Sequence, residues 1–427
     1  MPPVRALARP SPRPHYRPMD DAIPTPPAPE QAAAKVMTRN LKQAANAEAR
    51  SLTVDSSRLT LMTDGPEMLA ALLALIDGAT SSLRLLYYIF AADGAGEKVR
   101  DALVRAVERG VKVSLLIDGF GSSKTPDNYF TALHEAGATF CRFLPAYGRR
   151  YLIRNHQKLA LADDKRVIIG GFNVEDDYFK ARDGGGWRDL GLLVEGPAAA
   201  RLAPYFDALI GWAVAKGTRI RELRRIIHKY SETEGALQWS FGGPMRRLSP
   251  WANATCRDLA NSSDVQMIAA YFAPTYGMLK RIGRVGGRGR AQVITAAKSD
   301  NTATIAAARF TYGRLLKRGV EIYEYRPTKL HTKLVVFDDI VHIGSSNFDI
   351  RSLYLNLEMM LRVADADFAG MMRIYFEGEK QDSLQITSEL QKRRGTLANR
   401  IKWGLSFFMV TTGDYTVTRR LNIGSGS

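Results

Sequence analysis

Short apolar runs alternate with helical patterns along this chain, and the same order of elements occurs twice. In the first half, a β-rich run at 83–90 is followed by a helical pattern at 99–109 and an apolar run at 111–118. In the second half, the run at 265–272 is the matching strand, and a weaker helix candidate separates it from the run at 291–295. Strands that alternate with helices predict βαβ units and a largely parallel sheet. We therefore predict an α/β protein with an internal duplication.

Each half contains the same phrase of one histidine, one lysine, one aspartate and, behind a glycine-rich turn, one asparagine. In chain order these residues are His156, Lys158, Asp163 and Asn173 in the first half, and His331, Lys333, Asp338 and Asn347 in the second. The spacing from histidine to asparagine is 17 residues in the first copy and 16 in the second. By chance a single His-x-Lys-x4-Asp match is expected on the order of 0.02 times per chain, so two matches, each followed by a glycine-rich turn and an asparagine, indicate a functional site.

The residue types in these phrases suit chemistry on a phosphodiester. Residues i and i+2 of a β-strand point to the same face, so each histidine should project beside its lysine. Two such half-sites brought face to face would gather two imidazoles, two ammonium groups and two carboxamides. The cations and amides suit the non-bridging oxygens, while one imidazole attacks phosphorus and the other acts as general acid and base. The lysines already supply positive charge, so we expect no metal and no other cofactor.

Four carboxylates accompany the two phrases, and we expect them to have two different roles. Asp163 and Asp338 lie at the predicted strand ends, where aspartate favours turns, and we expect them to hold the fold. Asp189 and Glu358 are better candidates for orienting the imidazoles, because a carboxylate on the far ring nitrogen fixes the tautomer. For Asp189, a surface carboxylate on a strand is the alternative.

Composition narrows the partners without selecting one. The formal net charge of +17 favours anionic partners, which include nucleic acid, an anionic membrane surface and a phosphate-bearing substrate. Two cysteines without a CxxC spacing argue against a disulfide framework. No run of about 18 apolar residues is present, so we predict no spanning helix.

The chain divides into five segments by composition and repeat. Residues 1–50 form a basic tail rich in proline and alanine, which we expect to be disordered and which lacks the apolar stretch of a signal peptide. The first repeat covers 51–217, a linker covers 218–262, and the second repeat covers 263–394. The basic and aromatic segment 395–427 suits a membrane-interfacial element, with an ordinary core helix as the alternative.

The paired phrases resemble the two motifs of the phospholipase D superfamily, and the chain is similar to its bacterial cardiolipin synthase branch without transmembrane helices. The resemblance covers roughly residues 55 to 425, and further stretches that carry it are Tyr88–Phe90, Asp118–Gly121, Trp187–Asp189, Ala270–Pro274, Gly344–Ser352 and Tyr415–Leu421. It implies two pseudo-twofold-related α/β/α sandwich repeats with one shared active site at their interface, and a phosphohistidine intermediate.

The resemblance also implies roles for individual residues. Ser345 and Glu358 join Asn347 in the second half-site, matched by Asn173 and Asp189 in the first. Ser345 corresponds to Gly171, so the first half-site lacks a hydroxyl. In this superfamily the N-terminal histidine is usually the nucleophile, which implies that His156 attacks and that His331 is the acid and base.

We therefore expect an enzyme that transfers a phosphatidyl group to a second lipid and so makes cardiolipin. A phospholipase D hydrolase and a metal-independent nuclease would use the same site, and a non-catalytic binder would have no need of two imidazoles. No nucleic-acid module is recognisable, so nucleic acid is not an expected partner. The expected partners are an anionic phospholipid and the membrane surface, at the inner face of a bacterial membrane as a peripheral protein. The sequence points to no protein partner.

Overall fold

The computed structural model describes residues 50–144, 153–215, 217, 219–245 and 247–413. The chain separates into two units, residues 1–46 and 47–427, and the described residues belong to the second. The predicted tail lies outside the described residues except for Arg50, and so does the segment beyond residue 413.

The first half comprises the following elements: β1 (Ser51–Val54), β2 (Ser57–Met62), α2 (Gly65–Asp77), β3 (Ser82–Tyr87), α3 (Gly94–Glu108), β4 (Lys112–Asp118), η1 (Asp127–Phe130), α4 (Thr131–Glu135), β5 (Thr139–Phe143), β6 (Leu159–Ala162), β7 (Arg166–Gly170), α5 (Asp176–Phe179), β8 (Gly191–Glu195), α6 (Pro197–Ala200), α7 (Ala203–Val214) and α8 (Ile220–Tyr230).

The second half comprises β9 (Leu237–Gly242), α9 (Pro250–Asn261), β10 (Asp264–Ala269), β11 (Phe272–Ala273), α10 (Tyr276–Arg288), β12 (Arg290–Ala296), α11 (Thr302–Leu316), β13 (Glu321–Tyr325), β14 (Lys333–Phe337), β15 (Ile340–Gly344), β16 (Phe348–Asp349), α12 (Ile350–Tyr354), β17 (Glu358–Ala364), α13 (Ala366–Gln381), β18 (Ser383–Gln385), α14 (Ser388–Arg394), α15 (Leu397–Phe408) and η3 (Met409–Gly413).

The predicted duplication is visible in the order of the strands. Within the described part of the chain, one eight-stranded sheet runs β1-β2-β8-β7-β6-β3-β4-β5 and the other runs β18-β13-β12-β10-β14-β15-β17-β9. Seven neighbouring strands correspond one for one when the second sheet is followed from β9 to β13. A short parallel pairing also recurs. In the first half Phe90 forms an isolated bridge with Val174, and in the second half β11 pairs with β16. The two halves therefore share one fold.

The expectation of a largely parallel sheet is wrong. In the first sheet β3, β4 and β5 are parallel, but β6, β7, β8 and β2 pair antiparallel to their neighbours. The second sheet has the same mixture. The reason is the short turn after each His-x-Lys strand, where Asp163, Asp164 and Asp338 have positive φ. A connection of this length can join only antiparallel strands, because parallel neighbours need a long crossover.

The segment at 218–262, which we expected to be a linker, is instead part of the fold. It contains α8, β9 and α9, and β9 pairs antiparallel with β17 as an edge strand of the second sheet. Leu237, Trp239 and Phe241 alternate along β9 and are buried in the core. The second repeat therefore begins at β9, which is the counterpart of β2.

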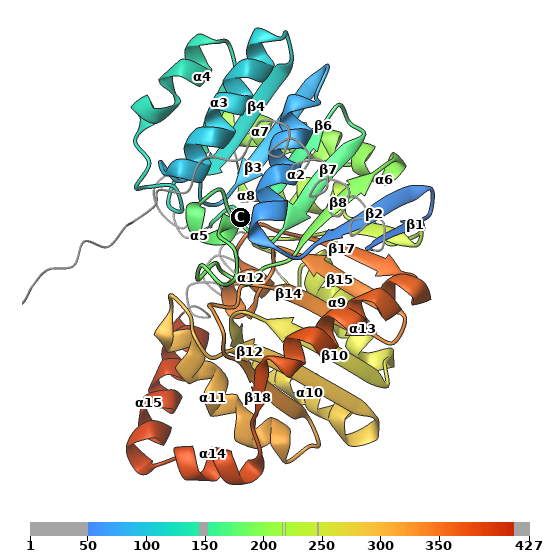
Figure 1. The fold of residues 1–427 in the computed structure, drawn as a ribbon. Coiled ribbons are helices and arrows are strands. Elements are labelled where there is room, and N and C mark those ends of the chain that lie inside the picture. The colour runs from blue at the N-terminus through green and yellow to red at the C-terminus, as the bar shows by residue number, and fades with distance from the viewer. Residues whose placement is uncertain (1–49, 145–152, 216, 218, 246, 414–427) are drawn as a thin grey trace, which may run out of the picture. The chain divides into compact units, whose positions relative to one another are not determined.

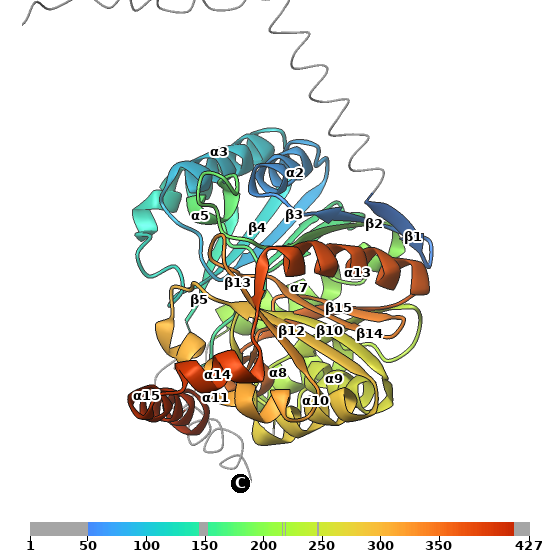
Figure 2. The ribbon, with the colours of Figure 1, turned by 60° about the horizontal axis from the view of Figure 1, so that its bottom comes forward.

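Helices and sheets form layers that bring the two halves together (Figures 1 and 2). Helices α2 and α3 pack on the outer face of the first sheet, and α9, α10 and α11 pack on the outer face of the second. The inner faces share one continuous core with α7 and α13, which includes Leu192 of β8 and Leu361 of β17. Because this core is common to both halves, the ends of their central strands meet.

Candidate active site

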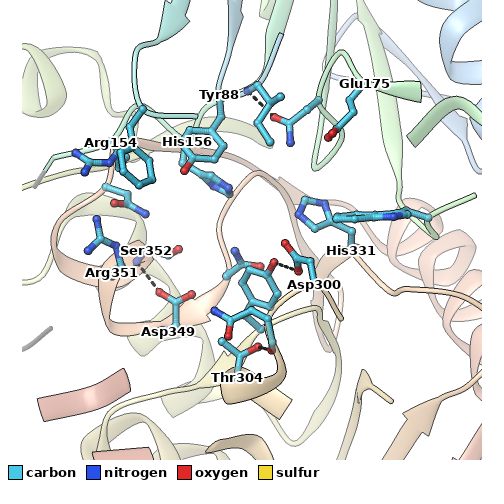
Figure 3. Close-up of a pocket in the computed structure, with 18 of the residues that line it drawn as sticks. Tyr88, Arg154, His156, Glu175, Asp300, Thr304, His331, Asp349, Arg351 and Ser352 are labelled. Atoms are coloured by element: carbon cyan, nitrogen blue, oxygen red, sulfur yellow. Dashed lines mark hydrogen bonds between the residues drawn. The ribbon is translucent and has the colours of Figure 1, made fainter. Parts of the chain in front are cut away.

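One cleft collects the central residues of both phrases. It has a volume of about 650 Å³, and His156, His331, Asn173 and Asn347 all line it. Figure 3 shows the two imidazoles pointing into the same open space from the two halves. Lys158 and Lys333 are buried beside their histidines. The structure thus brings together all six residues predicted to carry the chemistry.

The backbone at each histidine is held by the opposite half. His156 and His331 lie in extended segments just before β6 and β14, rather than inside those strands as expected. The His156 amide donates to the Leu357 carbonyl at 2.9 Å, and the His331 amide donates to the Arg188 carbonyl at 2.7 Å. The site is therefore assembled by the contact between the halves, and neither half can form it alone.

The same contact exchanges the two orienting carboxylates. His156 Nδ1 lies 3.1 Å from Glu358 Oε2, and His331 Nδ1 lies 2.7 Å from Asp189 Oδ2. Glu358 follows Leu357, and Asp189 follows Arg188, so each backbone bridge carries a carboxylate to the histidine it holds. The assignment of Glu358 to the second half-site and Asp189 to the first is therefore corrected, because each serves the histidine of the other half.

The carboxylates differ in their surroundings. Ser345 Oγ donates to Glu358 Oε2 at 2.5 Å and accepts from the Met359 amide at 3.0 Å. At the corresponding Gly171, an added Cβ would lie 2.4 Å from Asp189 Oδ1. Because Gly171 has no side chain, the Asp189 carboxylate occupies the space that a side chain at this position would fill.

This asymmetry changes the protonation of the two pairs. Burial raises the pKa of Asp189 to about 7. Burial also opposes ionisation of Glu358, but His156, Lys158 and the Ser345 hydroxyl together hold the pKa of this carboxyl below its usual value. Burial lowers the pKa of His156 and lowers that of His331 well below its usual range. Both imidazoles are therefore neutral at rest, while the pair of His331 and Asp189 retains a proton up to near neutral pH.

The two lysines are buried, and the pKa values of their ammonium groups lie close to neutral pH. Lys158 Nζ donates to the His156 carbonyl at 2.6 Å, and burial lowers its pKa to about 7. Lys333 Nζ lies 2.8 Å from His331 Nδ1, and burial lowers its pKa to about 8. An anionic phosphate in the cleft would favour the charged form of both lysines.

The two asparagines occupy the cleft differently. Asn173 Oδ1 accepts from the Ile89 amide at 3.1 Å, and its Nδ2 donates to the Tyr178 hydroxyl at 3.0 Å. That hydroxyl lies 3.5 Å from His331 Nε2. Asn347 Oδ1 is buried without a hydrogen-bond partner among the described residues. The amide oxygen of Asn347 is therefore an acceptor that no donor among the described residues satisfies.

Asp163 and Asp338 lie outside the cleft. Asp163 accepts from the backbone amides of Thr80, Ser81 and Ser82, at the start of β3. Asp338 accepts from the backbone amide of Asp264 at 2.9 Å, at the start of β10. These contacts tie the turn after each His-x-Lys strand to its neighbouring strand, a role in holding the fold.

Sequence reasoning missed the aromatic walls of the cleft. The Tyr88 ring is 5.0 Å from the His156 ring, and Tyr178, Trp187 and Tyr271 surround His331. The sequence contains one signal for these walls, because a tyrosine follows the equivalent strand in each repeat, Tyr88 after β3 and Tyr271 after β10.

The charged residues at the mouth were also missed, since they lie outside the paired phrases. They are Lys124, Arg154 and Arg351 with positive charge, and Glu175, Asp300 and Asp349 with negative charge. Figure 3 places Arg154 and Arg351 on the side of His156, and Asp300 on the side of His331. Within the described ranges, no group of three histidine, cysteine or acidic side chains is arranged to hold a metal ion.

Comparison with known proteins shows the family of the chain. The family model described as "Cardiolipin synthase, PLD-like domain" matches residues 72–210 and 256–379, which include both phrases. The chain belongs to this family.

Curated relatives within the family align over most of the chain. A protein named "Cardiolipin synthase 1" from Bacillus cereus is 29% identical over 357 residues, which is 79% of this chain and 70% of that protein. A protein named "Cardiolipin synthase" from Alkalihalophilus pseudofirmus is 31% identical over 350 residues, covering 79% of this chain and 69% of that protein.

A solved structure confirms the fold expected for the family. The crystal structure of phosphatidylserine synthase from Haemophilus influenzae aligns with a TM-score of 0.64 and 14% identity, over 90% of this chain and 99% of that one. Among the described residues, no helix combines the length and the apolar character needed to cross a bilayer.

Proposed function

We propose that this protein is a phosphatidyltransferase that makes cardiolipin from two phospholipids through a phosphohistidine intermediate. The observation that carries the proposal is the pair of buried imidazoles in one cleft, each with a carboxylate on Nδ1. That arrangement leaves His156 Nε2 available for phosphorus, and His331 Nε2 has only the Tyr178 hydroxyl at 3.5 Å as a neighbour that a substrate oxygen would replace. The names of the curated relatives agree with this substrate class.

In the first step, His156 Nε2 attacks the phosphorus of the donor lipid. The bond from phosphorus to the glycerol oxygen of the headgroup breaks, and His331 protonates that oxygen so that glycerol leaves. The phosphatidyl group is now bonded to His156, whose Nδ1–H remains hydrogen-bonded to Glu358.

In the second step, His331 removes the proton from the hydroxyl of the acceptor lipid. The alkoxide oxygen forms a bond to phosphorus while the bond from phosphorus to His156 breaks. The product is cardiolipin, and both histidines return to their starting protonation. Water in place of the acceptor would give phosphatidic acid.

The protonation of the two pairs supports the division of roles. An ionised Glu358 keeps the proton of His156 on Nδ1, which leaves the Nε2 lone pair free to attack. The raised pKa of Asp189 keeps a proton on the His331 pair, where an incoming phosphate anion favours its transfer onto the imidazole. Lys158, Lys333, Asn173 and Asn347 would stabilise the non-bridging oxygens as negative charge develops.

The substrate class supports a place at a membrane surface. We propose that the protein acts as a peripheral protein at the inner face of a bacterial membrane, where its phospholipid substrates reside. The net charge of +17 suits an anionic lipid surface.

The decisive assay gives the pure protein phosphatidylglycerol vesicles and, separately, plasmid DNA. Cardiolipin with an equivalent of free glycerol supports the proposal. Formation of phosphatidic acid alone would show that the protein is a hydrolase instead, and nicking of the DNA would show that it is a nuclease. His156→Ala and His331→Ala should each abolish turnover with unchanged circular dichroism, whereas His134→Ala, on the exposed face of α4, should retain it.

A further inference from the structure

Helix α15 presents an apolar stripe to solvent. The stripe consists of Leu397, Ile401, Leu405, Phe408 and the adjoining Met409, whose exposures lie between 58% and 77%. Residues three or four apart share one face of a helix, so these side chains form a continuous band. On the opposite face Trp403 is buried. The stripe is therefore the outward face of a helix whose other face is anchored.

The anchor is the neighbouring helix α11. The two helices lie side by side in both ribbon views (Figures 1 and 2). Phe310 of α11 packs against Phe407 with ring centroids 5.0 Å apart, and its ring would meet a Cβ at Gly404 at 3.4 Å. These contacts hold α15 in a fixed orientation, so the stripe is a defined surface and not a frayed end.

A basic groove borders α15 on the side of Arg400 and Trp403. The sequence from 390 to 413 contains no aspartate or glutamate. A groove of about 910 Å³ between α11, α14 and α15 has no acidic residue in its lining and is lined by six cations, Arg309, Arg314, Lys317, Arg318, Lys392 and Arg400. A helix with an apolar band on one side and basic residues from Arg400 onward on another is complementary to a bilayer of acyl chains with anionic headgroups.

The stripe lies next to the mouth of the catalytic cleft. Val410, which directly follows the stripe, lines that cleft. Thr304, in the first turn of α11, lines it as well. A surface bound at the stripe would therefore adjoin the opening through which a lipid headgroup must enter.

We propose that α15 docks this protein on an anionic lipid bilayer, with the stripe among the acyl chains and the basic groove on the headgroups. The proposal rests on the proposed function, because a phospholipid substrate is what gives the docking its purpose. Docking would present the headgroups to the cleft without extracting the lipid from the membrane.

The test compares two exposed isoleucines in the full chain. Ile401→Glu places a carboxylate in the stripe, and Ile374→Glu makes the same change on α13, where Ile374 is 77% exposed. Co-sedimentation uses vesicles of phosphatidylcholine alone and vesicles with phosphatidylglycerol added. We expect Ile401→Glu to weaken binding to the anionic vesicles at least about tenfold, and Ile374→Glu to bind like the native protein.

Turnover of a short-chain phosphatidylglycerol dissolved as a monomer separates docking from chemistry. We expect Ile401→Glu to keep native turnover on it while losing turnover on vesicles. Native vesicle binding by Ile401→Glu, or equal losses in both variants, would overturn the docking proposal and leave the chemistry standing. A dimer that Ile401→Glu dissociates, with vesicle binding unchanged, would show that a second copy of the chain covers the stripe. Absence of turnover on both substrates by the native protein would instead overturn the proposed function.

Discussion

Replacing Gly171 by alanine should impair catalysis, because the added methyl group would displace the carboxylate of Asp189. The added Cβ would lie 2.4 Å from Asp189 Oδ1 and 2.7 Å from Oδ2, and such contacts below 3.0 Å essentially never occur. The carboxylate must therefore retreat by at least about 0.6 Å from its position 2.7 Å from His331 Nδ1. A displacement approaching 1 Å in a catalytic group lowers turnover by up to about a hundredfold.

We expect Gly171→Ala to lower kcat by between about tenfold and about a hundredfold, with little change in KM. The free energy of unfolding should fall by about 1–3 kcal/mol, because the site is closely packed. Gly171 does not have positive φ, so backbone strain does not contribute. The measurements are cardiolipin formation from phosphatidylglycerol vesicles under saturating lipid, and urea unfolding followed by circular dichroism.

The matched control is Gly287→Ala in α10, where an added Cβ meets no atom within 4 Å. It should leave kcat unchanged and stabilise the helix by about 0.5–1 kcal/mol. If Gly171→Ala acts through Asp189, adding it to Asp189→Asn should cost little further activity. Native turnover by Gly171→Ala would refute the inference that the Asp189 carboxylate must remain where it lies.

Three further predictions follow from the charges of the site and its frame. The kcat/KM of the free enzyme should fall as pH rises above about 7 to 8, because Lys158 and Lys333 are charged only below their pKa values of about 7 and about 8; a profile flat to pH 9 would contradict this. Ser345→Ala should lower kcat about tenfold and move the acidic limb of the rate profile to higher pH, since the hydroxyl lowers the pKa of Glu358; an unmoved limb would exclude that role. Asp163→Asn should cost about 1–2 kcal/mol of unfolding free energy at neutral pH with kcat intact. The pKa of Asp163 is lowered in the fold, so this loss should begin to shrink as pH falls below about 4 and disappear only as pH falls through the lowered pKa; a loss independent of pH would rule out the charge.

The composition of the site was predictable from the sequence because it is written twice. His156 and His331 each occur with a lysine at i+2 and an asparagine beyond the next turn. Two short phrases in equivalent places of a duplicated fold must converge if the halves pack about a pseudo-twofold axis. The structure bears out that convergence in a single cleft.

The pairing of the carboxylates was not predictable in the same way. Asp189 follows His156 in the chain and Glu358 follows His331, so proximity along the sequence favours pairs within each half. The bridges from Asn155 to Leu357 and from Arg188 to Leu330 reverse that choice. They depend on how two complete halves meet, which no local pattern encodes.

The boundary of the second repeat failed for a different reason. The strand β9 has the apolar and polar alternation expected of a half-buried strand, but it begins at Leu237, 28 residues before the start of the recognised match at 265–272. Its partner β17 lies more than a hundred residues later in the chain, so its place in the sheet is decided by a distant contact. The residues at the cleft mouth, such as Asp300 between β12 and α11 and Arg351 in α12, are brought to the site only by the assembled fold.

The central claim, that two histidines from different halves act in turn on one phosphorus, is tested most directly with phosphatidyl p-nitrophenyl ester. Nitrophenolate leaves without a proton, so the first step needs a nucleophile but no acid. In His331→Ala we predict a burst of one equivalent of nitrophenolate, slow turnover afterwards, and a phosphatidyl adduct that peptide mapping after alkaline quench locates on His156. In His156→Ala we predict no burst. A burst in His156→Ala that is absent in His331→Ala, or an adduct on any other residue, would contradict the account.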